Sequence, residues 1–112
     1  MGAKIKGAGS NTIEIQGVEK LKDVSYNIMA DRIEAGTFLC LAAMTNGNIL
    51  LKNIDATYIN PVINKLEETG CNFNETKSSI EITAPKRLKA VDIKTMPYPG
   101  FPTDMQSIFG TA

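Results

Sequence analysis

The chain contains no histidine and no tryptophan, only two cysteines, Cys40 and Cys71, and only two arginines, Arg32 and Arg87. Two distant cysteines without histidine do not make a zinc motif, so we expect no metal site. A disulfide between them stays open as an alternative, although cytosolic cysteines are usually reduced. We expect Cys40 to pack as a small apolar side chain.

An excess of charge of either sign is also missing, because twelve basic residues balance twelve acidic ones. No run of lysine or arginine is long enough to indicate nucleic-acid binding. The longest apolar run, around Phe38 to Met44, is well below the roughly 20 residues that cross a bilayer, and the N-terminus has no signal-peptide core. We therefore expect a cytoplasmic protein with neither nucleic acid nor membrane as a partner.

With 112 residues, of which 43% are hydrophobic and 21% charged, the chain is long enough for one domain and too short for two. Alternation with a period of two predicts paired opening strands at Thr12–Gln16 and Val24–Met29. Asp31 predicts a helix start at which it accepts from an early backbone N–H while Glu34 reaches back toward the cap. Asn46 with the following glycine predicts a left-handed stop.

The pattern then predicts a strand, a second helix, a hairpin and another strand. These are Asn48–Ile54, a helix that has Tyr58 on its apolar face, Pro61 in its first turn and Gly70 as its end, Cys71–Glu75 with Ser79–Thr83, and Ala90–Thr95. Gly36, inside the first helix, costs up to about 1 kcal/mol relative to alanine. We therefore expect a close packing neighbour at Gly36.

A proline-rich loop near the C-terminus presents one carboxylate. Pro97, Pro99 and Pro102 restrict backbone φ and bias the residue before each toward extended conformations. The loop therefore holds Asp104 at low entropic cost at the start of the apolar segment Met105–Phe109. Such a presentation is typical of a site residue, and the alternative is that Asp104 is only a helix N-cap.

The segment leading into Asp31 is similar to the one leading into Asp104, which makes a weak internal repeat. The second unit stops at Ala112, after roughly two helical turns. Ile108 and Phe109 are then left without the strands that should bury them. We therefore expect a piece of a longer protein, whose exposed apolar face at these two residues could drive self-association.

Two motifs carry a resemblance to a known family: Asp31-Arg32-Ile33-Glu34-Ala35-Gly36-Thr37-Phe38 and Phe101-Pro102-Thr103-Asp104-Met105-Gln106. The chain resembles the EPSP synthase-like enolpyruvyl transferases, and within them the branch that acts on UDP-N-acetylglucosamine. The resemblance implies an α/β (α+β) fold made of the βαβαββ units of an inside-out α/β barrel. The implied layout is a single partial domain at 1–112, with opening strands at 8–30, one βαβαββ-type repeat at 31–95, and a loop with the start of the next repeat at 96–112.

The resemblance implies that the intact protein transfers enolpyruvyl from phosphoenolpyruvate to the 3-hydroxyl of UDP-N-acetylglucosamine, without a cofactor, in the first committed step of peptidoglycan synthesis. Asp104 matches the family aspartate that contacts this hydroxyl and is proposed to remove its proton, before a ketal intermediate loses phosphate. Thr103, Asp31 and Arg32 are further candidates for substrate binding. The alternative for Asp31 is a helix cap, and for Arg32 a surface position.

Other parts of the family's site cannot be placed in this sequence. They are a lysine-asparagine pair, a reactive cysteine on a mobile loop, and several arginines that hold phosphoenolpyruvate. We therefore expect no transferase activity from the chain alone, and its expected partner is the remainder of the same polypeptide. The alternatives are a related transferase that acts on shikimate 3-phosphate, and a folded scaffold or self-associating module without the chemistry.

Overall fold

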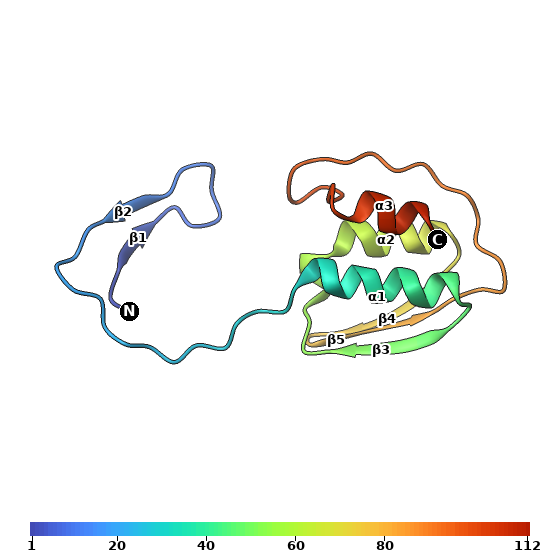
Figure 1. The fold of residues 1–112 in the computed structure, drawn as a ribbon, viewed down its shortest axis with the longest axis horizontal. Coiled ribbons are helices and arrows are strands. Elements are labelled where there is room, and N and C mark those ends of the chain that lie inside the picture. Colours follow the sequence, from blue (N-terminus) through green and yellow to red (C-terminus); the bar gives the residue numbers. More distant parts are fainter.

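The computed structural model describes residues 1–112, which divide into an N-terminal arm, residues 1–30, and a packed body, residues 31–112 (Figure 1). Every residue of the arm before Ala30 is exposed. Because the arm lies to one side of the body, the chain measures 58 × 27 × 20 Å and its radius of gyration is 17.4 Å. A compact chain of this length would have a radius of about 13 Å. The hydrophobic core therefore belongs to the body.

The arm contains one hairpin, in which β1 (Lys4–Lys6) pairs antiparallel with β2 (Glu14–Gln16). The sequence predicts that the strand at Thr12–Gln16 pairs with Val24–Met29. This pairing is wrong, because Val24–Met29 forms no strand and is exposed. The loop between β1 and β2 contains Gly7 and Gly9, which have positive φ values of 74° and 88°. Glycine adopts this conformation without steric cost, so the chain reverses there and brings β1 to β2.

The body contains a three-stranded sheet with the order β3-β5-β4, in which the central β5 (Ser79–Thr83) is antiparallel to both neighbours. The outer strands are β3 (Asn48–Lys52) and β4 (Asn72–Thr76). Ile80 and Ile82 of β5 are fully buried on one face. The predicted hairpin is confirmed, and the predicted strand from residue 48 is confirmed with its end two residues earlier.

Helix α1 (Arg32–Met44) begins as the sequence predicts. The Oδ1 atom of Asp31 accepts from the amides of Ile33 at 2.7 Å and Glu34 at 3.3 Å. The Glu34 side chain makes no return bond to the cap, so that half of the predicted capping arrangement is wrong. At the other end Asn46 has a φ of 53°, which confirms the left-handed stop.

A 3₁₀ turn (Ala56–Tyr58) leads into helix α2 (Asn60–Glu68), whose first turn contains Pro61, as predicted. Proline is favourable there because the first amides of a helix have no intrahelical acceptor. Gly70 follows the helix with a φ of 103°, which confirms it as the stop.

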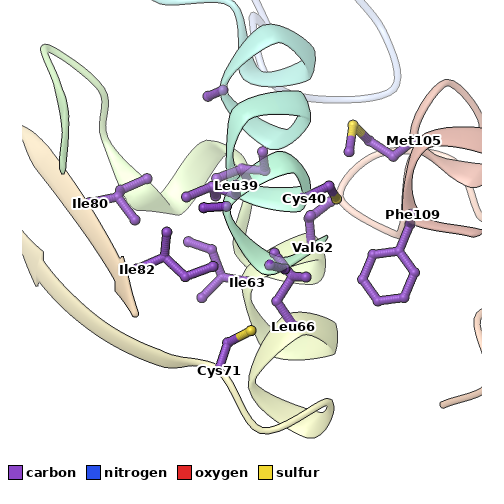
Figure 2. Packing of buried hydrophobic residues seen from close by; sticks show 14 of the residues in the cluster. Leu39, Cys40, Val62, Ile63, Leu66, Cys71, Ile80, Ile82, Met105 and Phe109 are labelled. Carbon is purple, nitrogen blue, oxygen red and sulfur yellow. The ribbon is translucent and has the colours of Figure 1, made fainter. Parts of the chain in front are cut away.

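Helices α1 and α2 cover one face of the sheet, and α3 packs on these helices on the side away from the sheet, so the core extends across both sides of the helix layer (Figures 1 and 2). The core combines aliphatic and small side chains of the helices and β5 with three residues near the C-terminus. Its members that are nearly or fully inaccessible are Leu39, Cys40, Ala43, Ile59, Val62, Leu66, Ile80, Ile82 and Met105. No helix of this structure is long and apolar enough to cross a membrane.

Helix α3 (Met105–Gly110) packs on α1, which corrects the expectation that the C-terminal apolar residues are unburied. Phe109 is only 7% exposed and Ile108 is partly buried. The sequence pattern predicts that further strands are needed to bury Ile108 and Phe109, but the helices of the body bury them instead. Face-to-face contact with α1 removes this surface from water without any further strand.

The strand predicted at Ala90–Thr95 is also wrong, because these residues form only an isolated bridge between Thr95 and Phe101. The amide of Lys89 donates to the carbonyl oxygen of Thr69, just after α2, at 2.9 Å. The segment is thus directed along the helices and away from the sheet edges, where a strand would find backbone partners.

Candidate functional site

The two sequence motifs meet where α1 begins beside the proline loop. The Cζ atom of Arg32, the first residue of α1, lies 5.7 Å from the centroid of the Tyr98 ring. A guanidinium group at this distance is attracted by the negative face of the ring. The structure therefore joins one predicted site residue, Arg32, to the loop that leads to another, Asp104.

Backbone hydrogen bonds and a buried aromatic pair hold the proline loop. The amide of Gly100 donates to the carbonyl of Pro97 at 2.7 Å, and the amide of Met96 donates to the carbonyl of Phe101 at 3.0 Å. The rings of Phe101 and Phe109 meet edge to face with centroids 5.5 Å apart. The loop is thus attached to α3 through Phe101, which lies just before Thr103 and Asp104, the residues that the loop presents.

Asp104 precedes α3 with a helical backbone, φ −62° and ψ −25°, and its side chain makes no capping hydrogen bond. Asp104 thus holds the N-cap position of α3 without the extended backbone and side-chain hydrogen bond that a capping aspartate usually has, and the alternative that it is only a cap stays a prediction. The amides of Met105 and Gln106 donate to the carbonyls of Pro102 and Thr103. Thr103 and Asp104 are both exposed, and the Asp104 carboxylate has no partner within the protein.

Asp31, in contrast, caps a helix through one of its two carboxylate oxygens. Its Oδ1 atom accepts both hydrogen bonds at the start of α1, and its backbone is extended, with φ −78° and ψ 116°. The cap explains this residue without a ligand. Asp31 nevertheless lines an open hollow, so its charge lies near that hollow.

A hollow of about 490 Å³ opens beside Arg32, between the end of the arm and the proline loop. Its lining residues are Met29, Ala30, Asp31, Arg32, Tyr58 and Tyr98. A second hollow of about 150 Å³ shares Arg32, Tyr58 and Tyr98 and adds polar groups that include Asn60 and Asn64. Thr103 and Asp104 line neither hollow, although Pro102, directly before them, lines the smaller one together with Arg32.

Tyr58 is the lining residue that sequence reasoning missed. Its spacing with the apolar residues that follow places it on the buried face of the second helix, yet it lies in the 3₁₀ turn before α2 and is 36% exposed. The signal that was available is Asp55, which accepts from the amide of Thr57 at 2.9 Å and so separates this turn from α2.

Neither cysteine has the properties of a reactive nucleophile. Both are buried free thiols, so the disulfide alternative is not realised. Burial, with a smaller contribution from the nearby Cys71, raises the pKa of Cys40 to about 11. Burial also raises the pKa of Cys71, although the hydrogen bond with Thr69 opposes this shift. The reactive form of cysteine is the thiolate, which is therefore scarce at neutral pH. No cluster of side chains suited to hold a metal ion is present.

The whole chain, residues 1–112, matches the protein family described as EPSP synthase (3-phosphoshikimate 1-carboxyvinyltransferase). The chain belongs to this family. Its mixed α/β architecture, with small sheets covered by helices, is consistent with an enolpyruvyl transferase-like fold. The resemblance inferred from the two motifs is thereby confirmed.

Curated members of the family are similar along nearly the whole chain. Two proteins of Caldanaerobacter subterraneus subsp. tengcongensis, named UDP-N-acetylglucosamine 1-carboxyvinyltransferase 1 and 2, are 53% and 55% identical over 107 residues, which are 96% and 95% of this chain. The UDP-N-acetylglucosamine 1-carboxyvinyltransferase of Thermodesulfovibrio yellowstonii is 51% identical over 110 residues, 97% of this chain. The matched part is 26% of each relative, so the chain spans about a quarter of their length.

In this EPSP synthase family chain the candidate residues thus belong to two groups, at the starts of two helices. One group is Asp31 and Arg32 with the two tyrosines of the hollows, and its charged groups come from the start of α1. The other group is Thr103 and Asp104, exposed at the start of α3.

Proposed function

We propose that this chain is part of an enzyme that transfers the enolpyruvyl group of phosphoenolpyruvate to the 3-hydroxyl of UDP-N-acetylglucosamine. The observation that carries the proposal is the 51–55% identity to three proteins named as carboxyvinyltransferases of this nucleotide sugar. The reaction begins peptidoglycan synthesis, on which bacterial cell shape and division depend, and we place it in the cytoplasm.

In the proposed reaction the 3-hydroxyl oxygen attacks carbon 2 of phosphoenolpyruvate while Asp104 takes the hydroxyl proton. Carbon 3 gains a proton from an acid that we do not assign to this chain, and a tetrahedral ketal results. Loss of a proton from the new methyl group and cleavage of the bond between carbon 2 and the phosphate oxygen then release inorganic phosphate. A positioned base typically contributes 10²- to 10⁴-fold in rate.

The environment of Asp104 supports this role. Its carboxylate is exposed and makes no capping bond, so both oxygens are available to a hydroxyl group. Thr103 precedes it on the loop, where its backbone or hydroxyl can contact the sugar. We assign substrate binding to Asp31 and Arg32 as well, at a separate part of a larger ligand.

We further propose that the body belongs to a βαβαββ unit of an inside-out α/β barrel. Its elements from α1 to β5 follow the order αβαββ. The outer edge of β3 has no neighbouring strand in the three-stranded sheet. A strand added along this edge would complete the unit, and we propose one repeat at 31–95 and the next repeat from 96, whereas the opening hairpin begins before residue 8, at Lys4.

The remainder of the same polypeptide is the proposed partner of the body. Phe38, Leu41 and Met44 of α1 are 46%, 50% and 46% exposed, which leaves apolar surface for further chain to cover. Self-association of the chain would cover the same surface. Sedimentation of the chain at increasing concentration separates the two, because a constant monomer mass argues against self-association.

An amide-resolved NMR titration of the chain with UDP-N-acetylglucosamine tests the proposed function. We expect dispersed signals, with shifts concentrated at Thr103, Asp104 and Asp31, and weaker binding by Asp104→Asn. Shikimate 3-phosphate is the control ligand, because the family description names a transferase that acts on it. Binding of shikimate 3-phosphate with no response to the nucleotide sugar would overturn the choice of substrate.

A dispersed spectrum that responds to neither ligand would support the alternative of a scaffold without the chemistry. The packing of α3 on α1 favours that alternative for the chain alone, because it forms a core without further strands. We expect no phosphate release when the chain is mixed with both substrates. Release at a rate that Asp104→Asn abolishes would contradict this expectation.

A further inference from the structure

Arg32 is a partly buried cation without a polar partner in the protein. The one ion pair of the structure joins Lys65 and Glu68, and Arg32 takes part only in its contact with Tyr98. Its Nε atom is buried and has no hydrogen-bond partner, whereas its terminal nitrogens are not among the buried atoms. Burying an N–H group of a charged side chain costs free energy when no acceptor replaces the water that it loses. A guanidinium in this state beside an open hollow indicates that an acceptor is to be supplied from outside the protein.

The Tyr98 ring holds the Arg32 guanidinium by its face, 5.7 Å from the centroid. Stacking on an aromatic face leaves the N–H groups at the edge of the guanidinium available for hydrogen bonds. Because no hydrogen bond anchors the side chain, it can rotate toward a ligand without first breaking one. The ring therefore orients the cation while its donors stay unused.

Other donors surround the same position. Tyr58 and Tyr98 line both hollows, and Asn60 and Asn64 line the smaller one, so two tyrosines and two asparagines accompany the guanidinium. The first free amides of α1 are not part of this set, because Asp31 accepts from them. The donor set therefore consists of side chains of α1, the 3₁₀ turn, α2 and the proline loop.

We propose that Arg32 binds a phosphate group in the hollow between the start of α1 and the proline loop. A planar guanidinium pairs with two phosphate oxygens at once, which suits a phosphate better than a single-point acceptor. The identity of the ligand rests on the proposed function, in which both the nucleotide sugar and phosphoenolpyruvate carry phosphate. The presence of an anion site rests only on the unpaired guanidinium and its surroundings.

Asp31 lines the same hollow, and its negative charge opposes the binding of an anion. Its two hydrogen bonds from the α1 amides place it at the positive end of the helix dipole, which offsets part of its charge. The positive charge of Arg32 then favours an anion more than the partly offset charge of Asp31 opposes it. We therefore expect weak affinity for phosphate alone and tighter binding of a ligand with further contacts to the tyrosines.

The side-chain Nε–H signals of a ¹⁵N-labelled chain test the proposal directly. The chain has two arginines, so Arg87, which is exposed and lines neither hollow, serves as an internal control. We expect pyrophosphate to shift the Arg32 signal and the amides around it along a saturable curve, with sodium chloride at matched ionic strength as the blank. Equal and unsaturable shifts at both arginines would overturn the site.

Two variants separate a specific site from general charge. Arg32→Lys keeps the charge but loses the planar fork and the stacking, and we expect pyrophosphate to bind roughly tenfold more weakly to it. Tyr98→Phe keeps the ring and loses only the hydroxyl, so we expect it to weaken binding less than Tyr98→Leu, which removes the aromatic face. Unchanged binding by both Arg32→Lys and Tyr98→Leu, with dispersed spectra, would refute the assignment.

Parallel titrations with UDP and phosphoenolpyruvate distinguish the two sources of phosphate. The ligand that moves the Arg32 signal at the lower concentration identifies the phosphate that this residue takes. If pyrophosphate shifts the Arg32 signal while UDP-N-acetylglucosamine shifts no signal, the anion site stands and the proposed function fails. If the nucleotide sugar shifts Thr103 and Asp104 while no phosphate compound affects Arg32, the proposed function stands and this inference fails.

Discussion

Met105 of α3 packs directly on Gly36 of α1, where a Cβ atom would lie 2.9 Å from both the Sδ and Cε atoms of the methionine. Met105 is fully buried. The δ carbon of Ile59 is equally close, at 2.9 Å. The predicted close neighbour of Gly36 is thus confirmed, and the absence of a side chain there is what lets α3 dock on α1.

Gly36→Ala should lower the free energy of unfolding by about 1 kcal/mol. Overpacking of a tight core costs about 1 to 3 kcal/mol, and the higher helix propensity of alanine returns up to about 1 kcal/mol. Urea denaturation measures the difference. In a Met105→Ala background we expect the same substitution to cost at least about 0.5 kcal/mol less, because neighbouring substitutions are coupled.

Gly110→Ala is the matched control, since it also lies in a helix but a Cβ there meets no atom within 4 Å. We expect its effect to be neutral or stabilising by a few tenths of a kcal/mol. Equal losses for the two substitutions would mean that the α1–α3 contact is not what requires glycine at position 36.

Phe109→Ala should destabilise the body by about 3 kcal/mol, in the range for loss of a buried aromatic ring. The ring is 7% exposed and meets Phe101 edge to face. The urea midpoint measures the loss, provided that the slope of the transition is unchanged. Ile108→Ala, at a partly buried neighbour, should cost about 1 kcal/mol. A loss below about 0.5 kcal/mol for Phe109→Ala would instead support an unburied C-terminal segment.

Asp31→Ala should cost about 1 kcal/mol, because it removes the acceptor of the first α1 amides. Asp31→Asn retains a capping oxygen and should stay within a few tenths of a kcal/mol of the parent. Asp104→Ala is the informative comparison, since Asp104 makes no capping bond. We expect Asp104→Ala to change stability by less than about 0.5 kcal/mol, and a loss equal to that of Asp31→Ala would restore the cap as the role of Asp104.

Stability should fall at alkaline pH because of Cys40. Burial raises the pKa of Cys40 from 9.0 to about 11. Between these values the thiol ionises in the unfolded chain and stays protonated in the folded one, so the contribution is complete below pH 9 and is lost as pH rises toward 11. Linkage gives a loss of about 1 kcal/mol between pH 8 and pH 10.

Unfolding measurements at pH 8, 9 and 10 check this decline, with Cys40→Ala as the control. We expect the free energy of unfolding of the parent to fall more steeply with pH than that of the variant. Parallel curves would show that other groups account for the alkaline loss. The native thiols should also react slowly with an alkylating reagent at pH 8 and rapidly after denaturation.

Local features of the sequence predicted most of the body correctly. The correct predictions are the cap at Asp31, the stop at Asn46, the proline in the first turn of α2 and the β4–β5 hairpin, and each depends on residues that are close together in the sequence. The predictions that failed concern partners far along the chain. The sequence shows that Val24–Met29 and Ala90–Thr95 suit a strand, but not whether a sheet edge lies beside them.

The candidate site divides in the same way. The sequence by itself determined the family, the rigid proline loop and the position of Asp104, because motif and turn chemistry are written in neighbouring residues. Only the tertiary structure decided that α3 is buried, that Arg32 stacks on Tyr98 and that Tyr58 borders the hollow. These contacts join segments dozens of residues apart. Their energies depend on the surface that the packed helices present, and no local pattern encodes that surface.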